Sequence, residues 1–217
     1  MTFRHSLAFA IAGFLTLSSV PAKPALLGVV MAAKLVHLNT TVVTAGATIF
    51  DGDRFSTETG GMLRLRSGTA IIELGEESAV SFRSPPADAQ SVEVRLDKGR
   101  LVFSAVRAAS IEIIACEARV RPSKDGRTVA QVKVTGPSEL RIDARRGALQ
   151  FSFRGETEKL TEGRSYRVIL DPPNNSPTEK GPVHPPKGFK IVLIGEGAAV
   201  VALGIYELRE PESPDRP

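Results

Sequence analysis

The 217-residue chain has no tryptophan, three histidines and a single cysteine, Cys116. One cysteine excludes a disulfide within the chain, and its apolar, alternating surroundings, IEIIACEARV, predict a buried and unreactive thiol. His5, His37 and His184 are far apart, and none stands at ligand spacing from a cysteine or a carboxylate, which argues against a zinc site. No cofactor is expected, because a chain of this length can close a core without a metal or a disulfide.

Runs of lysine and aromatic RNA-binding motifs are also missing, although the formal net charge is +4. No nucleic-acid partner is therefore expected, while anionic polymers of the cell envelope stay open as partners. The chain has no phosphate-binding loop and no Gly-x-Ser-x-Gly motif. Glu73, Glu76 and Glu77 are typical of a solvated turn rather than of a glycosidase pair. The chain is not expected to be an enzyme.

Residues 1–22, MTFRHSLAFAIAGFLTLSSVPA, have the pattern of a secretory signal peptide. A short positive head precedes an apolar stretch, and Val20 and Ala22 fit the small-residue positions of a cleavage site. An uncleaved anchor is the alternative. Either interpretation predicts that the rest of the chain is exported.

Residues 189–208, FKIVLIGEGAAVVALGIYEL, have the length and apolar character of a single transmembrane helix. Twenty residues make a helix of about 30 Å, which matches a bilayer core. Glu196 opposes insertion, and it could lie in lipid or in the seam of an oligomer. Gly195 and Ala199 have the small-xxx-small spacing of packed helices, so a homo-oligomer that forms through this anchor stays open. This segment predicts the membrane as a partner.

Between residues 40 and 171 apolar and polar residues alternate almost throughout. In MLRLRS, Leu63 and Leu65 point one way while Arg64 and Arg66 point the other, which is a period of two. Glycine-containing turn signals separate the alternating runs, among them residues 97–99, 124–126 and 145–147. The predicted fold class is all-β, with antiparallel strands in a sandwich or a short β-solenoid, plus the C-terminal transmembrane helix.

The run VTAGATIFDGDRFSTETGGMLRLRSGTAIIELGEESAVSF resembles the FecR-type domain. The likeness is carried by Gly52-Asp53, Thr57, Gly61, Gly68 and Ser78, covers residues 41–107, and continues less distinctly over 108–170. It implies an extracytoplasmic all-β module with no catalytic residues. The best-known members relay a receptor signal to a sigma factor through a cytoplasmic region before a membrane helix. Only six residues precede the apolar stretch here, so the anti-sigma role is not expected.

These features predict a non-catalytic, membrane-anchored FecR-like envelope protein whose β domain lies on the extracytoplasmic side. It would act in sensing, scaffolding or binding an envelope protein; the alternative is a binding module for an anionic envelope polysaccharide. Candidate binding residues on the polar face of the sheet are Arg64, Arg66, Arg141 and Arg145, whose other interpretation is solubility of an exposed face. The predicted organisation is a signal peptide (1–22), a lead-in (23–40), a FecR-like β domain (41–171), a proline-rich spacer (172–188), a transmembrane helix (189–208) and a polar tail (209–217).

Overall fold

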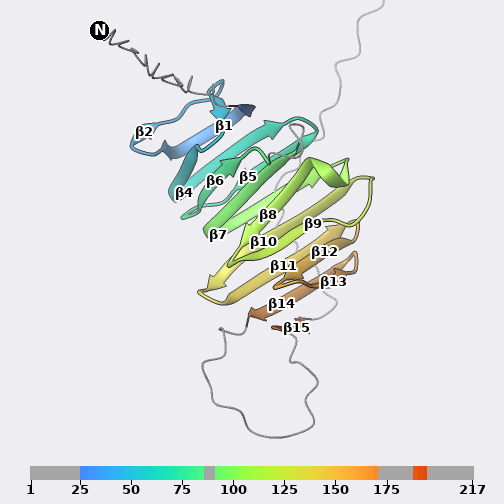
Figure 1. Ribbon diagram of the computed structural model, residues 1–217. Helices are drawn as coiled ribbons and strands as arrows, with labels where there is room; N and C mark the ends of the chain where they lie inside the picture. Colours follow the sequence, from blue (N-terminus) through green and yellow to red (C-terminus); the bar gives the residue numbers. More distant parts are fainter. Residues whose placement is uncertain (1–24, 86–90, 171–187, 195–217) are drawn as a thin grey trace, which may run out of the picture.

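The computed structural model describes residues 25–85, 91–170 and 188–194, which form fifteen β-strands and one short 3-10 helix. The strands lie side by side in a stack, with β1 near one end and β14 and β15 at the other (Figure 1). Their bounds are β1 Leu26–Leu38, β2 Thr41–Val42, β3 Thr48–Phe50, β4 Arg54–Ser67, β5 Ala70–Leu74, β6 Ala79–Arg83, β7 Val92–Ala105, η1 Ala108–Ser110, β8 Ile111–Ala115, β9 Ala118–Pro122, β10 Thr128–Gly136, β11 Glu139–Arg146, β12 Leu149–Phe153, β13 Glu156–Leu160, β14 Arg164–Leu170 and β15 Phe189–Leu193. The all-β, antiparallel prediction is confirmed, except that β7 and β8 pair in parallel.

All fifteen strands belong to one hydrogen-bonded sheet, which the long strands β1, β4 and β7 fold into two layers. Residues 92–96 of β7 pair with β6 and β8, whereas residues 99–105 pair with β5 and β10. The first layer therefore holds β6, β8, β9, β12 and β13, and the second holds β5, β10, β11, β14 and β15. Alternate residues of both layers meet in a single apolar core.

Aromatic contacts show the two layers closing on each other at the β15 end of the molecule. Phe151 of β12 lies in the first layer and Phe189 of β15 lies in the second. Their ring centroids are 5.0 Å apart at an interplanar angle of 72°, the edge-to-face arrangement that aromatic pairs favour. The protein is thus a sandwich whose long strands pass from one layer to the other.

Each long strand bends where its backbone has a positive φ. The bends lie at Leu35 of β1 (φ 50°), Gly60 of β4 (φ 71°) and Gly99 of β7 (φ 84°). At the middle bend, a Cβ on Gly61 would lie 2.8 Å from the carbonyl oxygen of Leu35, so only glycine allows β1 and β4 to approach this closely.

The turn predicted at residues 97–99 is wrong, because β7 continues through it as one strand. The β6–β7 register shifts at this point: Ala79 pairs with Lys98 but Val80 pairs with Leu96, so residue 97 is extra. This is a β-bulge, which needs the same polar residues and positive-φ glycine as a tight turn. The signals at 124–126 and 145–147 do mark chain reversals, before β10 and β12.

Residues 23–40, predicted to be a lead-in to the β domain, contain strand β1. Residues 29–38 of β1 pair with β4 in both layers, and Val30 and Val36 are buried in the core. This part of the chain therefore belongs to the sheet. The sequence LLGVVMAAKLVHL alternates poorly because β1 has one register shift at Met31 and another at Leu35, and each shift interrupts the period of two.

The transmembrane prediction for residues 189–208 is wrong over its first five residues, which form β15. Strand β15 pairs antiparallel with β14, with Leu170 opposite Phe189 and Tyr166 opposite Leu193. Hydrophobicity alone does not distinguish an edge strand from the start of a helix. In the part of the chain that the structure describes, no helix has the length and apolar character to cross a bilayer. The rest of that prediction, residues 195–208, lies outside the described residues, as do the signal peptide, most of the spacer and the tail.

Candidate functional site

The four predicted arginines lie on the outer face of the second layer, but in two separate pairs. Arg64 and Arg66 are on β4, and Arg141 and Arg145 are on β11. Strands β5, β7 and β10 stand between them. Four strand spacings of about 4.8 Å place the two pairs roughly 19 Å apart. The four arginines therefore share one face of the sheet, but they do not form one cluster.

On β11, a hydrogen-bonded network brings Arg141 and Arg145 together. Arg145 Nη2 donates to Gln131 Oε1 (3.1 Å), and Gln131 Nε2 donates to Asp143 Oδ2 (3.0 Å). Arg141 Nε donates to Asp143 Oδ1 (3.2 Å). Because Gln131 is buried, this network is held on a rigid part of the sheet. It orients both guanidinium groups while leaving most of their donors free to face solvent.

On β4, the two predicted arginines differ in their surroundings. Arg64 Nε lies 3.2 Å from Glu73 Oε1, at an angle too poor for a hydrogen bond, so the contact is electrostatic. Arg66 is exposed. Arg64 therefore joins β4 to β5, and Arg66 is the member of this pair that a ligand could reach.

A row of four basic residues on the same face was missed by the sequence analysis. Arg100 of β7, Lys133 of β10, Arg141 of β11 and Arg167 of β14 stand directly opposite one another on adjacent strands. We call these four residues the basic row. Only Arg141 belongs to both the predicted set and the basic row. The row depends on the pairing of β7 with β10, strands that are not consecutive in the chain, so spacing along the sequence gives no direct sign of it.

At the β14 end of the basic row, Arg167 forms a two-pronged ion pair with Glu139. Its Nε and Nη2 atoms lie 2.9 Å and 2.8 Å from the two carboxylate oxygens. These hydrogen bonds from Arg167 are the main cause that lowers the pKa of Glu139, and those to Glu139 raise the pKa of Arg167.

The Glu139–Arg167 pair is expected to make the free energy of unfolding depend weakly on pH in the acidic range. Because the folded state lowers the pKa of Glu139 below 4.5, its contribution is present above that value and is lost as the pH falls further. At neutral pH the wild type should unfold at a slightly higher temperature than Glu139→Gln, and this difference in midpoint should shrink in acid. Glu156→Gln, on the exposed strand β13, is the control. An advantage that grew as the pH fell would contradict this assignment.

The three glutamates predicted to form a solvated turn each contact β4. Glu73 pairs with Arg64, Glu76 Oε2 accepts the backbone N–H of Gly60 (2.8 Å), and Glu77 Oε1 accepts the hydroxyl of Thr59 (3.1 Å). Glu76 and Glu77 thus contact adjacent residues at the bend of β4, and Glu73 contacts the strand further along.

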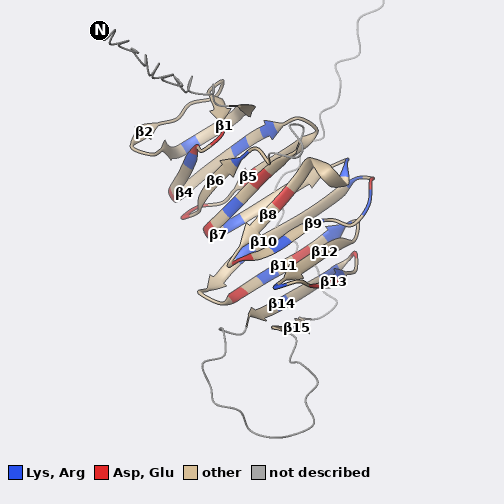
Figure 2. Cartoon of the chain, viewed as in Figure 1, with Lys and Arg blue, Asp and Glu red and all other residues tan. Residues whose placement is uncertain are grey.

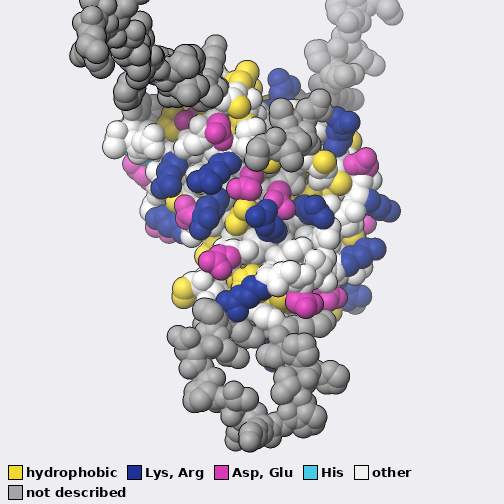
Figure 3. Space-filling model, viewed as in Figure 1, with side chains coloured by type: hydrophobic (Ala, Val, Ile, Leu, Met, Phe, Trp, Pro, Cys, Tyr) yellow, Lys and Arg dark blue, Asp and Glu magenta, His cyan; other side chains and the backbone are white. Residues whose placement is uncertain are grey.

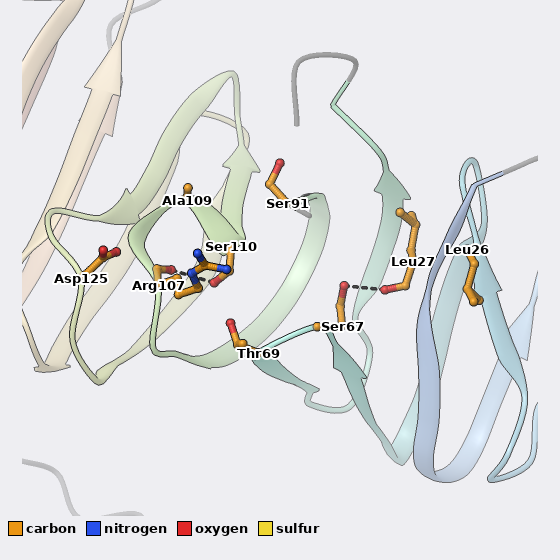
Figure 4. A pocket seen from close by; sticks show the side chains of 10 residues that line it. Leu26, Leu27, Ser67, Thr69, Ser91, Arg107, Ala109, Ser110 and Asp125 are labelled. Atoms are coloured by element: carbon orange, nitrogen blue, oxygen red, sulfur yellow. Dashed lines mark hydrogen bonds between the residues drawn. The ribbon is translucent and has the colours of Figure 1, made fainter. Parts of the chain in front are cut away.

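A hollow of about 420 Å³ lies between the start of β1, the β4–β5 turn and η1, lined in part by Arg107 and Asp125 (Figure 4). The Ser67 hydroxyl donates to the carbonyl of Leu27 (2.5 Å), and Asp125 Oδ1 accepts the backbone N–H of Ala108 (2.7 Å). The Ser110 hydroxyl donates to the carbonyl of Arg107 (2.7 Å). These groups hold adjoining loops together.

Cys116 lies in the turn between β8 and β9 and is only partly buried, so the predicted full burial is wrong. Burial raises the pKa of its thiol, and the neighbouring Glu117 carboxylate raises it further. A raised pKa lowers the thiolate fraction, which agrees with the unreactive thiol predicted from the sequence. Within the described ranges, no three His, Cys, Asp or Glu side chains come together as metal ligands.

Charges of both signs cover the described surface. Along β11 acidic and basic positions alternate, and the visible face shows Lys and Arg side chains interspersed with Asp and Glu (Figures 2 and 3). Large exposed apolar side chains lie at both ends of the sheet. Six are near the β1 end, Leu26, Met31, Leu35, Val42, Phe50 and Met62, and three are at the β15 end, Val192, Leu193 and Ile194. The basic row and the larger apolar group at the β1 end are the two surfaces that differ most from the mixed background.

Comparison with known proteins gives a distant structural likeness. Two crystal structures of a proposed anti-sigma factor from Parabacteroides distasonis, at 1.65 Å and 2.50 Å resolution, align with a TM-score of 0.44 and 12% sequence identity. The alignment covers 54% of this chain and 54% of each of those chains, so it spans about half of the proteins it matches. No family model and no curated protein matches the sequence.

Proposed function

We propose that the protein is a non-catalytic, FecR-like module of the cell envelope that acts by binding a partner protein. The observation that carries the proposal is the apolar surface at the β1 end. Met31 and Leu35 occupy the two register shifts of β1, and they are 39% and 48% exposed. Met62, on the neighbouring β4, is 42% exposed. Exposed apolar side chains that lie together at one end of a sheet are typical of an interaction surface.

The form of the β1 edge indicates how a partner would bind. Bulges at sheet edges interrupt the row of backbone groups that an added strand would need. The two register shifts therefore favour contact through the side chains of Met31 and Leu35 over strand addition. Sensing and scaffolding both need such a surface.

Location outside the cytoplasm is part of this proposal and is supported by the signal-like residues 1–22 and by the FecR resemblance. A spanning helix over residues 189–208 is not part of it, because residues 189–193 belong to β15. Protease treatment of intact spheroplasts tests the location. Digestion of the β domain is expected, and full protection together with recovery in the cytoplasmic fraction would contradict it.

Photo-crosslinking in intact cells tests the binding surface. A photoreactive residue at Met31 or Leu35 is expected to give one discrete crosslinked product, because both side chains project from the apolar end. The same residue at Lys159, exposed on the distant strand β13, is the control and is expected to give none. Equal crosslinking from both places would contradict the proposal.

A second candidate function is binding of an anionic envelope polysaccharide. It is favoured by one observation, the network that presents Arg141 and Arg145 together on the outer face of β11. Ordered guanidinium groups recognise carboxylates at a smaller entropic cost than mobile ones. The two functions use different surfaces and can be tested separately.

A further inference from the structure

The basic row places like charges directly opposite one another, an arrangement that does not favour stability. Arg100, Lys133, Arg141 and Arg167 are each directly opposite the next on adjacent strands, and like charges in that position repel. Buried neighbours such as Leu101 and Val132 alternate with them and fix their outward direction. The fold therefore holds four cations in a line across the strands at a cost in stability.

Two members of the basic row have acidic partners, and the other two do not. Arg141 contacts Asp143 at 3.2 Å and Arg167 contacts Glu139 at 2.8 Å. Among the residues that the structure describes, no ion pair involves Arg100 or Lys133. In the half of the row on β7 and β10, neither cation thus has a carboxylate of the described residues within ion-pair distance.

A hollow of about 410 Å³ adjoins this half of the row and is lined by Arg100, Lys133, Glu76 and Glu77. The two glutamates are directed elsewhere, because their carboxylates bind the Gly60 N–H and the Thr59 hydroxyl on β4. Arg100 extends over Gly75, where a Cβ would lie 2.9 Å from its Nε. The glycine leaves room for the guanidinium to lie along the surface, where a bound anion could reach it.

The spacing of the basic row matches an extended polymer. Adjacent strands are about 4.8 Å apart, so the four cations span roughly 14 Å in a nearly straight line. A linear polysaccharide with a carboxylate on each sugar unit presents negative charges at regular intervals along an extended chain. Such a chain could contact the cations in turn if it lay perpendicular to the strands.

We propose that the basic row binds a linear, carboxylate-bearing polysaccharide that lies across β7, β10, β11 and β14. This inference rests on the second candidate function and places its site: three of the four residues, Arg100, Lys133 and Arg167, are outside the predicted set. A single-stranded nucleic acid fits less well, because such sites combine cations with aromatic side chains on which bases stack. The outward neighbours of the row in the described sheet are aliphatic, polar or acidic rather than aromatic, as at Val102, Gln131 and Asp143.

Affinity electrophoresis of the purified protein in gels that contain polygalacturonate tests the proposal. The wild type should be retarded by polygalacturonate but not by neutral dextran, and less strongly at higher salt. The variant Arg100→Gln/Lys133→Gln should bind about tenfold more weakly, the effect of two exposed ion pairs near the upper end of their usual strength. The matched control, Arg121→Gln/Lys159→Gln, removes the same charges from the first layer and should change affinity by less than about twofold.

A charge-conserving variant, Arg100→Lys/Lys133→Arg, separates loss of charge from loss of fold. It should bind like the wild type, and the neutral variant should unfold at the same or a higher temperature because repulsion is relieved. Equal weakening by the neutral and control variants would overturn the proposal, since it would show a diffuse charge effect. Absence of binding, or equal binding of dextran or of single-stranded DNA, would also overturn it. None of these outcomes affects crosslinking at the β1 end, so failure here and failure of the partner-binding function are distinguishable.

Discussion

Replacing Gly99 with alanine is expected to lower the free energy of unfolding by about 2–5 kcal/mol. A positive φ costs an L-residue about 1–2 kcal/mol, and overpacking of a tight site adds about 1–3 kcal/mol. Both apply at Gly99, which has φ 84° and whose absent Cβ would collide with the side chain and backbone of Ser78. At a loss near 3 kcal/mol, the midpoint of thermal unfolding should fall by roughly 10 °C.

Gly52 provides the matched control for this experiment. Its φ of 89° is close to that of Gly99, but nothing lies within 4 Å of the position that a Cβ would occupy. Gly52→Ala should therefore show only the backbone cost, about 1–2 kcal/mol. Equal midpoints for the two variants would mean that Ser78 moves aside without cost, and the packing argument for the β7 bend would then be wrong.

The residues that carry the FecR resemblance have a structural role at the strand bends. The backbone N–H of Ser78 donates to Thr57 Oγ1 (2.9 Å), and the Thr57 hydroxyl donates to the carbonyl of Gly75 (2.6 Å). The backbone N–H of Arg100 donates to Ser78 Oγ (2.9 Å), beside Gly99. Thr57 and Ser78 thus tie the β5–β6 connection to β4 and β7 where those strands change layer. These residues of the motif therefore hold the bends at which the sheet folds over.

Local alternation predicted the strands and the side that each residue faces. Leu63 and Leu65 are buried while Arg66 is exposed, as the period of two requires. The basic row was not predicted, because Arg100 meets Lys133 only through the pairing of β7 with β10. Pairing between distant strands is decided by the packing of the whole core, and a single sequence does not display it.

The bulge at residue 97 and the strand at residues 189–193 were missed for a different reason. A bulge and a tight turn place the same demand on Gly99, and an apolar edge strand has the composition of the start of a membrane helix. With β15 in the sheet, residues 189–193 are not available to a spanning helix. The local sequence is compatible with a bulge or a turn at residue 97 and with a strand or a helix at residues 189–193, and tertiary contacts decide which forms.

Strand β15 leads to the second large prediction: Phe189→Ala should destabilise the β domain by about 3–5 kcal/mol. Phe189 is 6% exposed, and its ring lies 5.0 Å from that of Phe151 and 6.4 Å from that of Phe153, both on β12 of the opposite layer. Removing the ring leaves a cavity where the layers meet and takes away two edge-to-face contacts. Thermal unfolding of the full chain measures the loss.

Val192→Ala, on the same strand, is the control for Phe189→Ala. Val192 is 38% exposed on the outer face opposite Arg167, so its truncation should change the free energy of unfolding by less than about 0.5 kcal/mol. A residue in a membrane anchor beyond the domain would have no effect on unfolding of the domain. Equal stability of Phe189→Ala and the wild type would therefore show that residues 189–193 are not part of the sheet, and would favour the predicted helix there. A large difference between Phe189→Ala and Val192→Ala would show that Phe189 packs in the core.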